Sequence, residues 1–185
     1  MERDAEATRR RLVAAGRAEF AAHGLNGARV DRIAAAARSN KAQIYHYFGN
    51  KAGLFDAVWD ELVEQIVVGV PLDVDDLPGF AADLSDLYAQ FPDIPRIVTW
   101  QRLERGEALN DLGVAEVRER TAAIAQAQAG GRVSTRFEPE ILFPLLAHLA
   151  MLWAAANPEV LTVVDLDDRA RRRDAVRRIA AALVE

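Results

Sequence analysis

The chain has 185 residues, of which 51% are hydrophobic and 28% are charged, and it contains no cysteine. This length and composition predict one or two globular domains with a sizeable core. The lack of cysteine excludes disulfides and a thiol nucleophile. No basic segment leads into an apolar run, and no stretch approaches the ~20 apolar residues that span a bilayer. We therefore expect a cytoplasmic protein without a membrane partner.

Charge is distributed unevenly along the chain. Residues 1–53 contain 10 Lys and Arg against 5 Asp and Glu, a net charge of +5, whereas residues 54–185 contain 13 against 23, a net charge of −10. A basic segment attracts phosphates because binding releases their counterions. The overall charge of −5 is therefore compatible with a nucleic-acid interface near the start of the chain.

Residues 29–53 predict two short helices joined by a tight turn. Asn40 is a favourable N-cap for a second helix from about 41 to 48. A helix-turn-helix unit reads DNA with its second helix. In both predicted helices apolar residues recur at helical spacing, so each has one buried side: Ile33, Ala34 and Ala37 in the first, and Ile44 and Phe48 in the second.

The outward arc of the second helix carries groups that suit DNA. Gln43 can pair with adenine in the major groove, and His46 can hydrogen-bond a base or a phosphate. Tyr47 can donate its hydroxyl to the DNA backbone. Upstream, residues 9–11 are three arginines for which phosphate contact and a solvated charged face are equally favoured. The residues predicted to bind DNA are Asn40, Lys41, Ala42, Gln43, Tyr45, His46, Tyr47 and Lys51.

The segment 44–55, Ile-Tyr-His-Tyr-Phe-Gly-Asn-Lys-Ala-Gly-Leu-Phe, resembles the DNA-binding signature of the TetR family of bacterial repressors. The resemblance covers roughly residues 8–60. It implies a homodimer with an N-terminal three-helix DNA-binding domain containing the helix-turn-helix and a C-terminal helical domain for ligand binding and dimerisation. Family positions matched upstream are Leu12, Ala14, Ala15, Phe20, Gly24, Val30, Ile33 and Ala34.

The chain departs from the family pattern at two places. The family usually has Gly-Val at the turn where this chain has Arg38-Ser39, and a threonine near the start of the second family helix where this chain has Arg29. Arginine adopts positive φ less readily than glycine. The turn is therefore expected to be either rearranged or modestly strained.

Downstream, the apolar pattern predicts further helices and no strand. Asn50 is a candidate N-cap for a helix that begins near Lys51 and fades at Gly69, and the acidic segment 71–78 reads as a linker. Later helices are predicted at about 77–90, 94–106, 112–129, 138–156 and 167–184. The fold class is thus all-α, with about nine helices. The predicted domains are 1–53 for DNA binding, 54–70 as a connecting helix and 71–185 for ligand binding and dimerisation.

The helix predicted at 138–156 is apolar nearly all round, which is more than one buried face requires. The family resemblance implies that a partner chain covers the second face, through a four-helix bundle made by the last two long helices of each chain. The run 171–173 of three arginines reads as a solvated or salt-bridged face, because Asp165, Asp167, Asp168 and Asp174 lie nearby in sequence. The predicted interface residues are Leu145, Leu149, Leu152, Val176, Ile179 and Leu183.

A pocket for a small, largely apolar effector combines aromatic walls with a few polar groups. Trp100 beside Gln101 is the preferred candidate, because Pro92 and Pro95 predict an irregular helix start that could hold a pocket open. The same aromatic residues also fit an ordinary core. The full candidate set is Tyr88, Phe91, Trp100, Gln101, Arg102, Glu104, Phe143, His148 and Trp153.

Catalytic motifs are absent from the sequence. A di-iron helical bundle needs Glu-x-x-His pairs, but Phe20, Gln43 and Leu145 stand three residues before the three histidines. There is no His-Glu-x-x-His and no Gly-x-x-x-x-Gly-Lys loop. We predict no enzyme, cofactor or metal, but a regulator that binds a near-palindromic operator in double-stranded DNA as a homodimer and is released by an effector. The alternative is an architectural DNA-binding protein insensitive to ligands.

Overall fold

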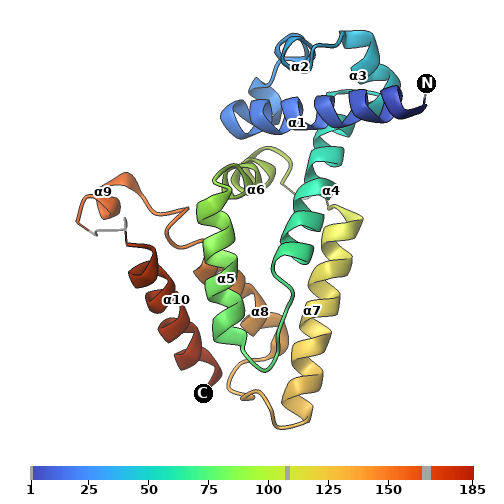
Figure 1. Ribbon diagram of the computed structural model, residues 1–185. Helices are drawn as coiled ribbons and strands as arrows, with labels where there is room; N and C mark the ends of the chain where they lie inside the picture. Colours follow the sequence, from blue (N-terminus) through green and yellow to red (C-terminus); the bar gives the residue numbers. More distant parts are fainter. Residues whose placement is uncertain (1, 107–108, 164–167) are drawn as a thin grey trace. The chain divides into compact units, whose positions relative to one another are not determined.

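A computed structural model describes residues 2–106, 109–163 and 168–185, which form ten α-helices and no strand (Figure 1). The predicted all-α class is confirmed, and the additional helix is the four-residue α9 (Pro158–Leu161). Within these ranges no helix is both long and apolar enough to cross a bilayer. The chain forms two compact units, Met1–Glu64 with Asp93–Asn110, and Gln65–Pro92 with Asp111–Glu185. The functional domain boundaries stay a prediction.

The first unit is built from α1 (Glu2–Gly27), α2 (Val30–Ala36), α3 (Lys41–Phe48), most of α4 (Lys51–Gly69) and α6 (Asp93–Glu104). Phe20 and Phe55 meet edge-to-face in its core, with ring centroids 5.1 Å apart. Burying such apolar side chains is the main force that holds the short helices together. The fully buried side chains of this unit include Leu12, Phe20, Ile33, Ile44, Leu54, Phe55, Ile94 and Ile97.

Helix α6 packs against α1 although 65 residues separate their ends in the sequence. Arg96 donates from Nε to the carbonyl oxygen of Ala21 at 2.9 Å, and Asp93 pairs with Arg17. The helix starts at Asp93 with a proline in its first turn, where proline is tolerated. The irregular start predicted from Pro92 and Pro95 is therefore wrong.

The far end of α6 meets a break in α1. Gly24 leaves helical geometry with φ 68° and ψ −177°, and a Cβ there would lie 2.8 Å from Cε3 of Trp100. The Glu104 carboxylate then accepts the backbone N–H groups of Leu25 and Asn26, the latter at 3.0 Å. Only glycine combines this φ with so close an aromatic neighbour. The break thus lets α6 cap the last turn of α1.

The second unit contains the end of α4 with α5 (Leu77–Gln90), α7 (Asp111–Ala129), α8 (Pro139–Ala150), α9 and α10 (Arg169–Val184). Helix α5 packs against α8 and α10, and α7 packs against α8. The predicted helix 77–90 is confirmed. The fully buried side chains here include Leu77, Leu84, Ile124, Leu142, Leu146, Val176 and Ala180.

Helix α8 is shorter than the predicted 138–156. It ends at Ala150, because the N–H groups of Met151 and Leu152 donate only three residues back, at 3.1 and 3.0 Å. Such bonds tighten a helix end into 3₁₀ geometry. Residue 167, the predicted start of the last helix, lies outside the described residues.

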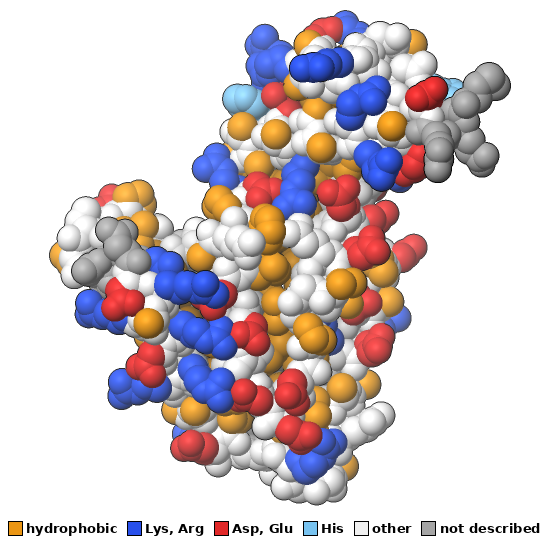
Figure 2. All heavy atoms as spheres, in the orientation of Figure 1, with side chains coloured by type: hydrophobic (Ala, Val, Ile, Leu, Met, Phe, Trp, Pro, Cys, Tyr) orange, Lys and Arg blue, Asp and Glu red, His pale blue; other side chains and the backbone are white. Residues whose placement is uncertain are grey.

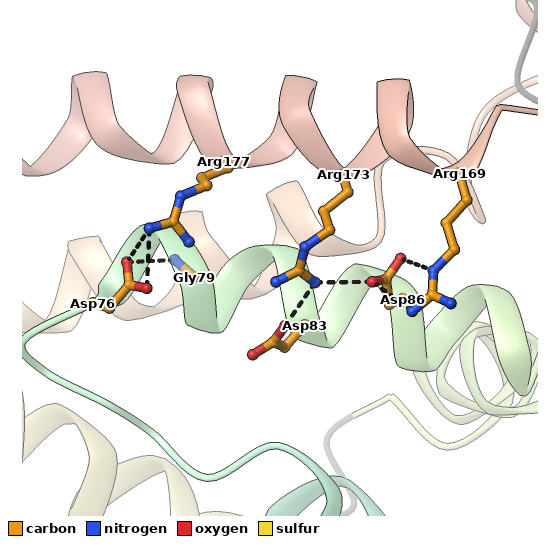
Figure 3. A network of polar contacts seen from close by, with 7 residues as sticks. All are labelled: Asp76, Gly79, Asp83, Asp86, Arg169, Arg173 and Arg177. Carbon is orange, nitrogen blue, oxygen red and sulfur yellow. Dashed lines mark hydrogen bonds and ion pairs between the residues drawn. The ribbon is translucent and has the colours of Figure 1, made fainter.

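Arginines on α10 form a ladder with aspartates on α5 and at its N-cap (Figures 2 and 3). Asp86 pairs with Arg169 at 3.0 Å and with Arg173 at 2.8 Å. Arg173 also reaches Asp83 at 2.6 Å, and Arg177 meets Asp76 at 3.0 Å.

The ladder confirms the salt-bridged interpretation of this arginine-rich face for Arg173, but with partners on α5 rather than beside it in sequence. Asp168 caps α10 by accepting the N–H of Ala170 at 2.9 Å, and Asp174 pairs with Arg178 at 3.7 Å. The other two predicted neighbours, Asp165 and Asp167, lie outside the described residues.

Candidate nucleic-acid interface

The turn between α2 and α3 keeps a Schellman-type geometry despite its arginine. Arg38 has φ 50° and donates its N–H to Ala35 at 3.1 Å, while the N–H of Ser39 reaches the carbonyl of Ala34 at 2.9 Å. This is the pair of bonds that closes a helix when the following residue is left-handed, a position usually taken by glycine. Of the two expectations for this turn, strain is therefore observed and rearrangement is not.

The start of α2 is capped from another helix. Arg29 makes no side-chain cap, but its N–H donates to the Glu19 carboxylate on α1 at 2.9 Å. Arg32 donates to the same oxygen at 2.8 Å. Burial raises the pKa of Glu19, but these hydrogen bonds outweigh it and leave the pKa below its ordinary value. The start of α2, where this chain lacks the family threonine, is thus capped by a side chain of α1.

The recognition helix α3 begins as predicted. Asn40 accepts the N–H of Gln43 at 3.0 Å, which confirms it as the N-cap. Tyr45 and His46 are exposed, whereas Gln43 and Tyr47 are half-buried. Ala42 is also exposed. The other four side chains provide amide, imidazole and phenol groups that suit base edges and phosphates.

The two flanking lysines already have partners. The Lys41 ammonium lies 2.7 Å from the Asp31 carboxylate, whose hydrogen bond raises the pKa of Lys41, and both side chains are exposed. Such surface pairs exchange readily. Lys51 donates to the carbonyl oxygens of Ala28 and Asn26, at 3.0 and 3.3 Å. Lys51 therefore joins α4 to the α1–α2 connection, whatever it contributes to DNA binding.

Asn50 and Gly53 fix the connection from α3 to α4. Asn50 accepts the N–H of Gly53 at 2.9 Å, which confirms the predicted N-cap. A Cβ on Gly53 would lie 2.1 Å from the carbonyl oxygen of Phe48, the last residue of α3. Real Cβ atoms do not approach a carbonyl so closely. Glycine at this position allows α4 to begin directly against the end of the recognition helix.

Two of the arginines at 9–11 contact the helix-turn-helix. Arg11 donates from Nε to the carbonyl oxygen of Ala37 at 3.2 Å, at the end of α2. Arg9 lies over the ring of Phe48, 5.7 Å from its centroid. These contacts favour a role in supporting α2 and α3 and leave phosphate contact as a prediction.

The predicted interface residues differ in accessibility. Leu145 and Leu152 are each 39% exposed and Ile179 is 45% exposed, while Leu149 and Leu183 are half-buried. Val176 is fully buried within its own chain. Its assignment to a dimer interface is therefore wrong: packing of α10 onto its own unit already covers this side chain.

The predicted effector residues are divided between the two units. Trp100, Gln101, Arg102 and Glu104 belong to the first unit, and the Glu104 carboxylate is occupied by backbone N–H groups of α1. The remaining candidates belong to the second unit: Tyr88 and Phe143 are buried, Phe91 and Trp153 are half-buried, and His148 is exposed with Nδ1 2.8 Å from the Pro144 carbonyl oxygen.

Sequence reasoning missed three charged residues with structural or site roles. Glu19 and Glu104 each cap a helix other than their own, 10 residues away for Glu19 and 78 or 79 for Glu104, and local patterns do not reveal such partners. Arg120 is buried, and its signal was available: it stands on the apolar stripe of α7, four residues before Ile124. A charge on that stripe is unusual.

Comparisons with known proteins agree with this geometry. Residues 12–58 match the family model described as bacterial regulatory proteins of the tetR family, and residues 76–181 match the tetracyclin repressor-like C-terminal domain. The chain is 38% identical over 168 residues to the HTH-type transcriptional repressor SCO4008 of Streptomyces coelicolor, covering 88% of this chain and 85% of that protein.

Solved structures of transcriptional regulators share the fold of this chain. The crystal structure of SCO4942 from Streptomyces coelicolor superposes with a TM-score of 0.85 at 35% identity, covering 96% of this chain and 98% of that one. AibR, solved with isovaleryl coenzyme A and operator DNA, shares the fold with a TM-score of 0.69 at 17% identity, covering 92% and 96%. Relatives and fold are those of transcriptional regulators, not of enzymes. The chain belongs to the TetR family and is a DNA-binding transcriptional regulator.

Proposed function

We propose that this regulator is a repressor that binds a near-palindromic operator as a homodimer and leaves it when a small, largely apolar effector binds. The geometry of α3 supports the DNA-binding part of this proposal, because α3 is a capped helix with exposed Tyr45 and His46 and half-buried Gln43. One recognition helix reads only a few base pairs, so a two-fold pair is needed for a discriminating site.

Exposed apolar residues on α8 and α10 support a homodimer. Ile141 is 50% exposed, and it shares a face of α8 with Leu145 because the two are four residues apart. Ile179 adds an exposed isoleucine on α10. Apolar side chains at this spacing are what helices present to a partner in a bundle. We propose that this surface meets its copy across a two-fold axis.

The relatives support the regulatory half of the proposal. SCO4008 is named a repressor, and AibR was solved with both an acyl-coenzyme A and operator DNA. Release by an effector requires different affinities for the DNA-bound and free conformations. Couplings of about 1 to 3 kcal/mol, a 5- to 150-fold change in DNA affinity, are typical.

Selection of bound sequences from random duplex DNA by the full-length protein tests the proposal, with the selected site then titrated at two salt concentrations. We expect enrichment of a near-palindrome, and an affinity for random DNA that falls more steeply with salt. Binding without enrichment would favour the second candidate, an architectural DNA-binding protein, which the helix-turn-helix alone also permits. A thermal-shift response to small apolar compounds separates these candidates further.

A further inference from the structure

Arg120, on α7, is a charged side chain buried in the second unit, with 8% of its surface exposed. It lies on the same stripe as Ile124 and Ala127, both fully buried. Arginine stays charged in proteins. A desolvated charge destabilises a fold unless well-placed partners compensate it. The side chain therefore needs either strong partners in the protein or another role.

The partners of Arg120 among the described residues are weak. One terminal nitrogen donates to the carbonyl oxygen of Val70 at 3.3 Å, and Nε lies 4.0 Å from the Glu116 carboxylate, at the limit of an ion pair. The guanidinium also lies 5.4 Å from the ring centroid of Phe80. A guanidinium carries five N–H donors. Among the described residues, the printed polar contacts of this group are the one bond to Val70 and the long pair with Glu116.

Tyr88, on α5, contributes a second buried polar group near the same charge. Burial raises the pKa of its hydroxyl to about 12, while the charge of Arg120 acts in the opposite direction. The phenol therefore remains a protonated hydrogen-bond donor at neutral pH. A guanidinium over the Phe80 ring, with a buried phenol on the same helix as that ring, matches an oxyanion attached to an apolar body.

We propose that Arg120 and the Tyr88 hydroxyl bind the anionic group of the effector, so that the effector is a small carboxylate or phosphate ester whose apolar body lies against Phe80. This inference rests on the proposed function, because it names the chemical class of the effector assumed there. Val70 directly follows α4, and α4 runs from the first unit into the second. An anion that takes over Arg120 therefore removes a hydrogen bond from the end of that helix.

The first test is the thermal stability of the ligand-free, full-length protein. If Arg120 binds a ligand, its buried charge destabilises the ligand-free protein. Arg120→Met should then raise Tm or change it by less than about 2 °C. If the Arg120 side chain stabilises the fold, Tm of Arg120→Met should fall by about 6 °C or more. Arg118→Met, which removes an exposed arginine from the same helix, controls for the change in charge. Arg120→Lys keeps the charge without the planar fork.

The second test measures ligand affinity by calorimetry. Decanoate and 4-phenylbutyrate are each compared with their neutral amides, and decyl phosphate distinguishes a phosphate preference from a carboxylate preference. We expect one or more of the acids to bind at least ~10-fold more tightly than its amide or alcohol counterpart. Arg120→Met should abolish this difference, Arg118→Met should retain it, and Arg120→Lys should give an intermediate value.

Equal affinity for acids and neutral counterparts would overturn the proposal, and a large loss of Tm in Arg120→Met would then assign Arg120 to the fold. Neither the Tm measurements nor the ligand titrations use DNA. If the acids bind through Arg120 but selection finds no operator, the regulatory function fails and the binding site stands. If selection finds an operator but acids and neutral counterparts bind equally, only the binding site fails.

Discussion

Among the α3 residues predicted to bind DNA, Gln43 is the one suited to reading a base. Replacing Gln43 with alanine should cost about 1 to 3 kcal/mol of binding free energy at one base position and relax the preference there. Titration of the selected operator, of operators altered at single positions and of random DNA measures this. Equal losses on operator and random DNA would assign Gln43 to the phosphate backbone.

Gly53 tests whether the α3–α4 junction positions the recognition helix. Gly53→Ala places a methyl group 2.1 Å from the Phe48 carbonyl oxygen, so the free energy of unfolding should fall by about 2 kcal/mol. Operator affinity should fall with it. Gly27→Ala is the matched control, since its Cβ would meet only the Cβ of His23, at 3.4 Å. Equal stability of both variants, measured by urea unfolding, would show that α4 can shift without cost.

The residue scale also shows what sequence alone could predict. Asn40 and Asn50 were predictable as caps because they contact residues three positions away. The partners of Arg29 and of Glu104 were not, since each lies on another helix. Val176 was assigned to a surface from its spacing, but spacing gives the apolar face of a helix and not which neighbour covers it.

At the scale of elements, helix α10 is held to α5 by charged pairs as well as by apolar contacts. Burial raises the pKa of Asp86, but hydrogen bonds from Arg169 and Arg173 outweigh that effect and lower it. Because the folded pKa is lowered, the contribution of Asp86 to stability is complete above the ordinary aspartate pKa of about 3.9 and is lost as pH falls through the folded value.

Asp86→Asn should therefore reduce the free energy of unfolding by about 1 to 2 kcal/mol at neutral pH. The gap to the original protein should be equal at pH 6 and pH 8 and should narrow below about pH 4. Urea unfolding at several pH values measures it. Asp83→Asn is the control, since this carboxylate is more exposed and, among the described residues, forms an ion pair with Arg173 alone. A gap that stayed constant down to pH 3 would contradict the role given to Asp86.

Helix bounds were predicted well where apolar spacing and a turn signal coincide. The segment 77–90 matches because Leu77, Phe80, Leu84 and Tyr88 mark one buried face. The end of α8 was placed six residues late, because the run of apolar residues continues past Ala150 while the backbone tightens. The position of α6 in the first unit was not predicted at all, since no local pattern encodes which distant helix it packs against.

For the whole molecule, the proposed homodimer can be tested on α10. Ile179→Glu adds a charge to a side chain that is 45% exposed, so it should leave the fold intact while desolvation of the charge opposes pairing. Sedimentation velocity should show monomers at concentrations where the original protein dimerises, and operator affinity should drop. Val117→Glu alters an equally exposed valine on α7 and should do neither. Unchanged dimers in Ile179→Glu would place the interface elsewhere.

The packing of α6 on α1 limits how this regulator can be cut and recombined. A hybrid that joined residues 1–64 to the sensing domain of another protein would discard α6. The N–H groups of Leu25 and Asn26 would lose their carboxylate, and the apolar side of α1 would be uncovered. The compact unit that contains α3 is thus discontinuous in sequence, 1–64 with 93–110. Designers of hybrid sensors should graft new sensing elements around α6 rather than in front of it.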